Sequence, residues 1–368
     1  MLDTSEFKVK GESFDQKDWK AVQIHCHSKY GDGTKSVKQL LKIARKESLD
    51  AIAITDHNNI NQINDPDFKS KDNLTVISGY EWGNVSKHTP GENEEYETSN
   101  LTGKAKRITR GPHAGILNIG NDTLIKASLE IDNLIEQVRH TKATIIINHP
   151  KLKGHNWPED IPSEFIQAIE IWNSRFSVLP RRKTKTEDFE PIEPGNLAVH
   201  NYDALKWWDS LLKMGLRITA VAGSNFHRWP QRLSSPCILT YAPNNTLAEI
   251  MNSIRNGNVI LVQKPEIKVF FKARENKNEH FYFNVGDSIK SSSNIYFTAI
   301  LEKVKGSTLF IYTRDGLYQS LKIPSNNFIF EFKHASRKSE KDFIRLEVRA
   351  SINSRIVRAI TNPIYINY

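Results

Sequence analysis

The chain has 368 residues, of which 38% are hydrophobic and 25% are charged, and its net charge is +9. This balance is typical of a globular protein with one large and one smaller domain, and the chain has no run of about 18 apolar residues that could span a membrane. The two cysteines exclude a disulfide scaffold and a cysteine-rich zinc site. The polar start of the chain lacks the apolar core of a signal peptide, so we expect a cytoplasmic protein, and the positive charge favours anionic ligands.

The first 264 residues alternate strand-like and helix-like segments, which predicts a parallel sheet. Five apolar runs end in residues that bind metals or transfer protons. The runs and the residues after them are 21–24 with His25 and His27, 51–54 with Asp56 and His57, 76–77 with Glu81, 145–147 with Asn148 and His149, and 220–222 with Asn225 and His227. Because a barrel of parallel strands gathers the carboxyl ends of its strands, we expect these residues to converge.

Helical periodicity separates the strands. Residues 37–44 place Val37, Leu40 and Leu41 on one face, which predicts an amphipathic helix. Thr246 and Glu249 form a capping-box pattern, so a helix begins there, and Gly257 can end it in a left-handed cap. Two polar stretches, 84–112 and 174–200, are long for structureless connections and are candidate active-site loops or insertions.

The pattern changes after about residue 265. Residues 344–350 alternate apolar and charged side chains, and residues 295–300 and 328–332 are rich in aromatic and β-branched residues. Turn signals such as Asp315-Gly316 separate these segments. We therefore predict an α/β domain over residues 1–264 and an antiparallel β-sandwich over residues 265–368.

The spacing of the polar residues indicates a metal centre. On a strand, His25 and His27 project from the same face, and Asp32 follows in a glycine turn that can aim its carboxylate back. Asp56 and His57 end a wholly apolar strand, where an unpaired titratable pair would be costly. Glu81 can bridge two cations with its two oxygens.

Neutral nitrogen donors complete the predicted set. His149 and His227 follow apolar runs, and His113 precedes one, which favours it over the competing His88. Imidazoles with a few carboxylates suit Zn²⁺, Mn²⁺ or Fe²⁺. Several such cations can generate a bridging hydroxide and clamp the oxygens of a displacement at phosphorus.

These residues, in this order, resemble the PHP family of polymerases and histidinol phosphatases over about residues 20–260. The resemblance implies a distorted (β/α)7 barrel with two or three metal ions at the strand ends. The predicted metal ligands are His25, His27, Asp32, His57, Glu81, His113, His149, Asn225 and His227, and the predicted catalytic residues are Asp56, His227 and Arg228. Residues 168–173, 205–224 and 361–365 are more narrowly similar to the CehA/McbA-like metallohydrolases, a branch that includes hydrolases of phosphoesters and of carbamates.

Asn225 departs from the family pattern, in which the last motif reads Gly-Ser-Asp-x-His. An amide oxygen is neutral and holds a cation more weakly than a carboxylate does. Three explanations stay open from the sequence: a centre with fewer or more weakly held metals, a variant made to trap a ligand, or a barrel that has lost catalysis. Asp32 can compensate for the missing carboxylate.

The sequence favours a metal-dependent phosphoesterase acting on a small anionic substrate, with Arg228, Arg175 and Tyr30 at the mouth of the site. Hydrolysis of a carbamate, amide or ester is the alternative within enzymes. Asn225 favours a third reading, a metal- or ligand-binding module with little catalysis. A nuclease is less favoured, since no basic block is interleaved with stacking aromatics.

Overall fold

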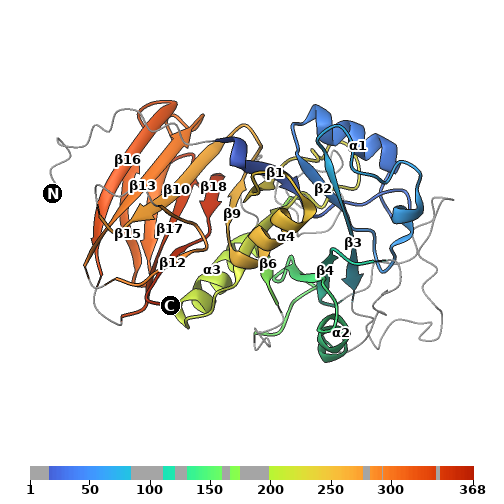
Figure 1. Cartoon of the computed structure of the whole chain (residues 1–368), viewed down its shortest axis with the longest axis horizontal. Helices are drawn as coiled ribbons and strands as arrows, with labels where there is room; N and C mark the ends of the chain where they lie inside the picture. The colour runs from blue at the N-terminus through green and yellow to red at the C-terminus, as the bar shows by residue number, and fades with distance from the viewer. Residues whose placement is uncertain are drawn as a thin grey trace, which may run out of the picture.

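The computed structural model describes residues 16–83, 111–120, 131–159, 166–174, 199–276, 282–291, 293–336 and 340–368. Figure 1 shows an α/β half on one side and a β-rich half on the other, with α3 and α4 in the middle of the view. No helix in these ranges is both long enough and apolar enough to cross a membrane.

The α/β half follows the predicted alternation of strands and helices. Its strands are β1 Trp19–Gln23, β2 Ala51–Ile54, β3 Thr75–Gly83, β4 His113–Leu117, β5 Thr144–Asn148, β6 Ala168–Asn173, β7 Thr219–Gly223, β8 Cys237–Tyr241 and β9 Val259–Val262. Its helices are η1 Gln16–Asp18, α1 Val37–Lys46, η2 Asn61–Asn64, α2 Ile131–Val138, α3 Val199–Lys213 and α4 Leu247–Asn256.

These strands form one sheet in the order β9-β8-β1-β2-β3-β4-β5-β6-β7. The neighbours β1, β2 and β3 are parallel, as are β5, β6 and β7, whereas β4 runs antiparallel to both of its neighbours. The sheet is therefore mixed, and its buried β2, β5 and β7 strands are apolar on both faces, as sheets covered on both sides require.

The predicted helix signals are confirmed. Ser36 and Gln39 form a capping box at the start of α1, and Thr246 and Glu249 form another at the start of α4. Gly257 ends α4 with φ of 80°, which is the left-handed conformation that glycine adopts without steric cost. Both helices bury one apolar face, so they are held by packing on the sheet as well as by their caps.

A side-chain amide spans the two ends of the α/β sheet. Asn362 accepts a hydrogen bond from Ala220 N at 2.7 Å, and its amide nitrogen donates to the carbonyl oxygens of Ala220 and Val259, at 2.9 Å each. It thereby bridges β7 and β9, the first and last strands of the sheet order. Within the described ranges no strand ladder joins β7 to β8 or β9.

The C-terminal half is mainly antiparallel, as predicted, although β12 pairs parallel with β19. Its strands are β10 Lys268–Arg274, β11 Phe283–Asn284, β12 Ser288–Ile289, β13 Asn294–Glu302, β14 Thr308–Thr313, β15 Gly316–Lys322, β16 Asn327–Ala335, β17 Asp342–Arg349, β18 Val357–Thr361 and β19 Ile364–Ile366. The sheet β11-β10-β13-β16 contributes Phe271, Phe297 and Phe332 to the core, with ring centroids 5.1 to 6.3 Å apart.

The remaining C-terminal strands extend the α/β sheet, because β18 pairs antiparallel with β9. Residue 265 falls between β9 and β10, but the hydrogen-bonded sheet continues across this predicted boundary. The division into domains 1–264 and 265–368 stays a prediction.

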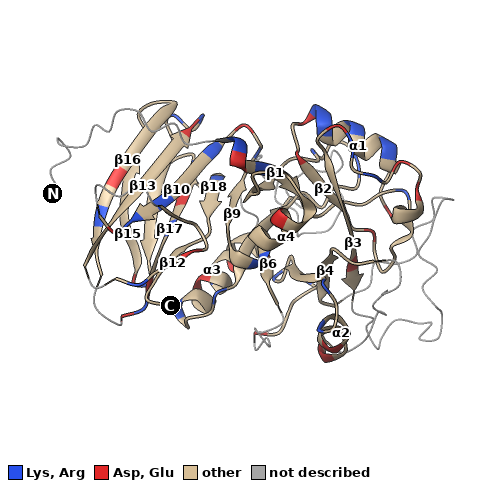
Figure 2. Cartoon of the chain, in the orientation of Figure 1, with Lys and Arg blue, Asp and Glu red and all other residues tan. Residues whose placement is uncertain are grey.

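Figure 2 shows Lys and Arg along α1, while acidic and basic residues are mixed elsewhere.

Candidate metal centre

Glu81, near the end of β3, is the centre of the site and is fully buried. Its two oxygens face nitrogen atoms of five histidines. The pairs are Oε1 with His149 Nε2 at 3.0 Å and His113 Nδ1 at 3.2 Å, and Oε2 with His57 Nδ1 at 3.2 Å, His25 Nε2 at 3.4 Å and His27 Nε2 at 3.4 Å. One carboxylate therefore collects five donors from four separate places in the chain.

Asp32 supplies a second carboxylate. Its Oδ1 atom lies 3.1 Å from His227 Nε2, 3.5 Å from His27 Nδ1 and 3.9 Å from His57 Nε2. Because His27 and His57 also face Glu81, these two rings stand between the carboxylates. Three overlapping sets of donors have mutual distances within 4.8 Å: His27, Asp32, His57 and His227; His25, His27 and Glu81; and His57, Glu81 and His113.

The sheet explains the convergence. His25, His57 and His149 follow strands whose carboxyl ends lie at one edge. His113 is instead the first residue of its strand, and because β4 is antiparallel, the pairing of His113 with Gly83 and Asn148 places it at the same edge.

A glycine allows the turn after β1 to close over the site. A Cβ atom on Gly33 would lie 2.2 Å from the carbonyl oxygen of His27, so only glycine fits. The same turn is joined to the last motif, since Thr34 N donates to His227 O at 2.8 Å. The rings of His27 and His227 stack with centroids 4.0 Å apart. The turn thus brings Asp32 close to His227, the last predicted donor in the sequence.

The protonation states suit cation binding. Burial, followed by the neighbouring His227, lowers the pKa of His27 well below its usual range, and burial lowers the pKa of His57 and of His149 to about 4. Although burial opposes it, His25 and His57 hold the pKa of Glu81 well below the ordinary value. Neutral imidazoles around an ionised carboxylate are the forms that coordinate metals.

The pKa of His25 moves the other way. Burial alone would lower it, but Glu170 and Glu81 raise it to about 10. The two buried carboxylates thus stabilise the protonated, positively charged form of this ring. A cation bound to the ring would take the place of its second proton.

The hydrogen bonding also fits a metal. His227 Nδ1 lies 2.8 Å from the carbonyl oxygen of Asn225, which can only accept, so Nδ1 carries the proton. His227 Nε2 and Asp32 Oδ1 are then two acceptors 3.1 Å apart, a pair that needs a cation or a proton between them. In the described part of the chain, His25 Nε2, both ring nitrogens of His27 and Glu81 Oε2 are buried without a hydrogen bond. The residues therefore fit a group of divalent cations.

Asn225 adopts φ of 47°, a left-handed conformation that asparagine tolerates better than most residues. Its carbonyl oxygen accepts from His227 Nδ1 and from Gln231 Nε2 at 3.1 Å. Its Oδ1 atom is buried and has no hydrogen-bond partner within the described ranges. Whether that oxygen binds a cation stays a prediction.

Asp56 does not belong to any of the three donor sets. Its carboxylate accepts hydrogen bonds from Ser28 N and Ser28 Oγ, both at 2.6 Å, and burial raises its pKa to about 7. This geometry makes it a support for the turn after His27, and its catalytic role stays a prediction.

Two of the three predicted substrate contacts, Arg228 and Tyr30, are among the described residues. Arg228 is exposed directly after His227, and Tyr30 is partly buried with its hydroxyl 3.1 Å from Asp65 Oδ2. Trp229, beside Arg228, is 67% exposed. Arg175 and His88 fall outside the described residues, as do most of the two predicted loops.

Sequence reasoning missed two residues, His155 and Glu170, and gave Asn148 no role of its own. Asn148 Nδ2 donates to Glu81 Oε1 at 3.0 Å, and the ring of His155 lies 4.4 Å from that of His113. Glu170 on β6 lies 3.0 Å from His25 Nδ1. The signal for Glu170 was a carboxylate inside an apolar run, the same kind of signal that pointed to Asp56. His155 had no such signal, because it lies in a polar connection.

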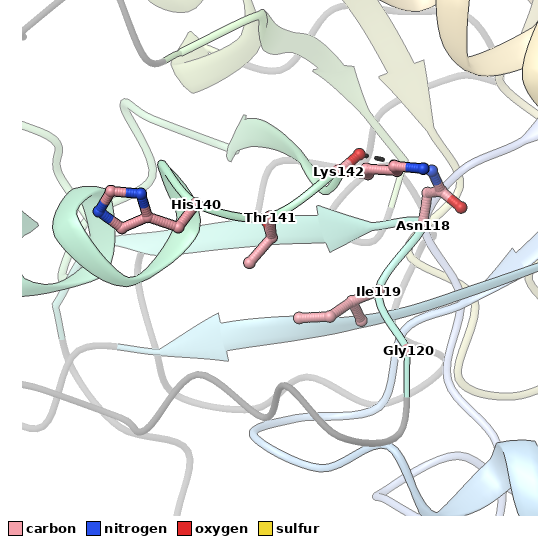
Figure 3. A pocket seen from close by; sticks show the side chains of 6 residues that line it. All are labelled: Asn118, Ile119, Gly120, His140, Thr141 and Lys142. Atoms are coloured by element: carbon pink, nitrogen blue, oxygen red, sulfur yellow. Dashed lines mark hydrogen bonds between the residues drawn. The ribbon is translucent and has the colours of Figure 1, made fainter.

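A separate cavity of about 340 Å³ is lined by Asn118, Ile119, Gly120, His140, Thr141 and Lys142. Figure 3 shows one hydrogen bond in it, from Asn118 Nδ2 to Lys142 O at 3.4 Å. None of the metal donors lines it, so it is not the candidate centre.

The fold and the site define an α/β protein with a buried cluster of histidines and carboxylates that could hold metal ions. Residues 23–165 match the model of the PHP domain. Asn225 and His227 lie beyond the matched stretch, and the CehA/McbA-like branch stays a prediction. No curated protein matches the chain.

Several solved structures are similar at low identity. A two-domain protein from Bacteroides vulgatus, described as containing a predicted PHP-like metal-dependent phosphoesterase, is 12% identical, with 95% of this chain and 94% of that one covered and a TM-score of 0.46. An amidohydrolase from Chromobacterium violaceum with bound sulfate and no metal is 11% identical, with 67% and 98% covered and a TM-score of 0.38. At these scores the similarity does not define the activity of this chain.

Proposed function

We propose that the chain is a metal-dependent hydrolase, specifically a phosphoesterase with two or three divalent cations, about the number found in clustered hydrolytic centres. The observation that carries the proposal is the position of His27 and His57 between the carboxylates of Glu81 and Asp32. Shared donors bring neighbouring cation positions close together. The nitrogen-rich donor set favours Zn²⁺, Mn²⁺ or Fe²⁺.

Cations bound here would supply Lewis-acid polarisation of a phosphoryl oxygen and activation of the attacking water. The protein holds the donors in fixed orientations, and this is its own contribution. Asn225 O fixes the tautomer of His227, and Asn148 holds one oxygen of Glu81. Burial excludes bulk water from the centre, which strengthens its electrostatic interactions.

The rim supports a small phosphorylated substrate. Arg228 places a guanidinium, which matches phosphate geometry, next to the donor His227. The exposed ring of Trp229 beside it offers an apolar surface to the organic part of a substrate. A cytoplasmic setting is part of the same proposal.

Asn225 favours a second candidate, a metal- or ligand-binding module with little catalysis, because a neutral amide replaces the expected carboxylate. A substrate panel separates the candidates: a phosphomonoester, a phosphodiester, single-stranded nucleic acid and an aryl carbamate, each with Mn²⁺ or Zn²⁺ added. We expect turnover of the phosphomonoester. Turnover of the carbamate alone would make the chain a carbonyl hydrolase, and no turnover with metal fully bound would favour the binding module.

Arg228→Gln makes the test specific. We expect it to raise KM for the phosphomonoester about tenfold, the effect of losing about 1.4 kcal/mol of charged hydrogen bonding. The matched control is Arg232→Gln, which removes another exposed arginine from the same loop. Equal KM values for the two variants would contradict a phosphate contact at Arg228.

A further inference from the structure

Glu170 is a fully buried carboxylate that touches two of the metal donors without belonging to a donor set. Its Oε1 atom lies 3.0 Å from His25 Nδ1, and its Oε2 atom accepts from His149 N at 3.1 Å. His25 follows β1 and His149 follows β5, so one side chain fixes the ends of two strands.

The local backbone is built around this carboxylate. A Cβ atom on Gly223 would lie 2.4 Å from Glu170 Oε1 and 2.6 Å from His25 Cβ, so Gly223 leaves the room that the pair occupies. The pairing of β6 with β7 also shifts register between Glu170 and Trp172. Such irregularities re-aim side chains next to functional sites.

A second layer of hydrogen bonds holds Glu170 itself. Asn173 Nδ2 donates to Glu170 Oε2 at 2.8 Å. The backbone of Asn173 is held in turn by Asn201 of α3, whose Oδ1 accepts from Asn173 N at 3.1 Å and whose Nδ2 donates to Asn173 O at 2.9 Å. A buried chain of polar contacts thus runs from α3 to the metal donors.

We infer that Glu170 is a positioning residue that determines which His25 nitrogen binds a metal. It acts in particular on the donor set formed by His25, His27 and Glu81. The inference rests on the metal centre of the proposed function. As an acceptor, Glu170 keeps the proton on His25 Nδ1, which leaves Nε2, 3.4 Å from Glu81 Oε2, to bind a cation. The described hydrogen bonds of Glu170 go to His25, His149 and Asn173. None of these residues belongs to the donor set of His27, Asp32, His57 and His227, so we expect that set to keep its cation without Glu170.

The test compares Glu170→Gln and Glu170→Ala with the full-length wild-type chain after removal of metal by a chelator. Mn²⁺ binding is measured by calorimetry and by elemental analysis. We expect one class of Mn²⁺ sites to weaken about 10- to 100-fold while the others keep their affinity. Glutamine should lose less than alanine, because its amide oxygen can still accept from His25 Nδ1.

A spectroscopic readout separates positioning from general destabilisation. In the Zn²⁺-loaded protein, the Nδ1 proton of His25 should give a slowly exchanging signal in the ¹H–¹⁵N spectrum, and Glu170→Ala should lose it. The control is Glu331→Gln, which removes a partly buried carboxylate hydrogen-bonded to Arg274 and Thr298 on the β-rich half. It should leave both readouts unchanged.

The outcomes are distinct. If the wild-type chain binds Mn²⁺ and the Glu170 variants bind it with the same stoichiometry and affinity, the inference is wrong and the proposed function stands. Uniform weakening of all sites, matched by Glu331→Gln, would also overturn it. If the wild-type chain binds no divalent cation, the proposed function fails and the inference fails with it.

Discussion

The two halves of the chain bury charged groups in different ways. In the β-rich half, the Arg345 guanidinium is 1% exposed, and its Nε and Nη2 atoms donate to the two oxygens of Asp209 at 2.8 and 2.7 Å. In the α/β half, His25, His27 and Glu81 are equally buried but keep atoms that form no hydrogen bond with any described residue. Buried charges that satisfy one another hold a fold together, whereas buried donors with open lone pairs require a ligand.

The Arg345 cluster also joins the two halves. Arg345 lies on β17, Asp209 lies on α3, and Arg345 Nη1 contacts Glu347 at 3.4 Å. The guanidinium carbon sits 4.3 Å from the ring centroid of Tyr312. Removing one partner from such a buried cluster typically lowers the free energy of unfolding by about 3–5 kcal/mol. The cluster therefore stabilises the packing of β17 against α3.

The largest expected effect comes from removing the β-rich half. A chain ending at residue 264 loses the β18 partner of β9, the Asn362 bridge between β7 and β9, and the Arg345 partner of Asp209. We expect insoluble protein or a chain without a cooperative melting transition, checked by soluble yield and circular dichroism. A folded fragment that still binds metal would instead support an independent domain over residues 1–264.

The next largest effect is expected from replacing His25 and His27, two of the candidate metal donors. Replacing His25 and His27 together with alanine removes donors from two of the three sets. We expect loss of at least one bound cation per chain and a fall in metal affinity of about 10²-fold or more, since even outer partners of metal ligands contribute 10- to 100-fold. Elemental analysis after dialysis measures it, with the exposed His140→Ala as control. Unchanged metal content would refute the assignment of this centre.

Most of the donors were predictable because they stand at or near the boundary of an apolar strand, whereas Asp32 lies in the turn after β1. A buried strand that ends in His57 or begins with His113 has few structural reasons to carry an imidazole there. His113 lies at the same edge as the other donors only because β4 is antiparallel, which the predicted parallel sheet did not include.

The remaining features depend on pairings between distant segments. Nothing local marks β18 as a partner of β9, and the three hydrogen bonds of Asn362 join residues more than a hundred positions apart. Glu170 carried a local signal, but its role could not be predicted because it is defined by contacts with His25 and His149 and by the space above Gly223. Sequence periodicity predicts which face of a strand is buried but not which partner lies against it.

A smaller effect is expected at position 225. Asn225→Asp keeps the side-chain size and adds a negative charge beside the donors, and aspartate also tolerates the left-handed backbone. If the amide weakens an otherwise competent centre, metal affinity should rise about tenfold, or about 1.4 kcal/mol. Calorimetric titration with Mn²⁺ measures this change, and activity on the phosphomonoester should rise with it. If affinity and activity both stay the same, residue 225 is not a ligand.

The smallest effect tests a satisfied charge in the β-rich half. Asp342 accepts hydrogen bonds from His334 Nε2 at 2.9 Å, from Arg314 N at 3.0 Å and from Phe343 N at 2.7 Å. Although burial opposes it, these bonds lower the pKa of Asp342 below its ordinary value of 3.8. A lowered carboxyl pKa means that the stabilisation is fully present above the unfolded value and is lost as pH falls through the folded one.

Asp342→Asn should therefore destabilise the chain by about 1 kcal/mol near pH 7, and the difference from wild type should shrink below about pH 4. Thermal unfolding between pH 3 and 7 measures the difference, and the exposed Asp315→Asn is the matched control. Metal content should not change, because Asp342 is not part of any donor set. A difference in stability that does not change with pH would mean that Asp342 acts through its shape alone and not through its charge. A loss of metal would mean that the two halves are coupled more closely than their separate charge networks indicate.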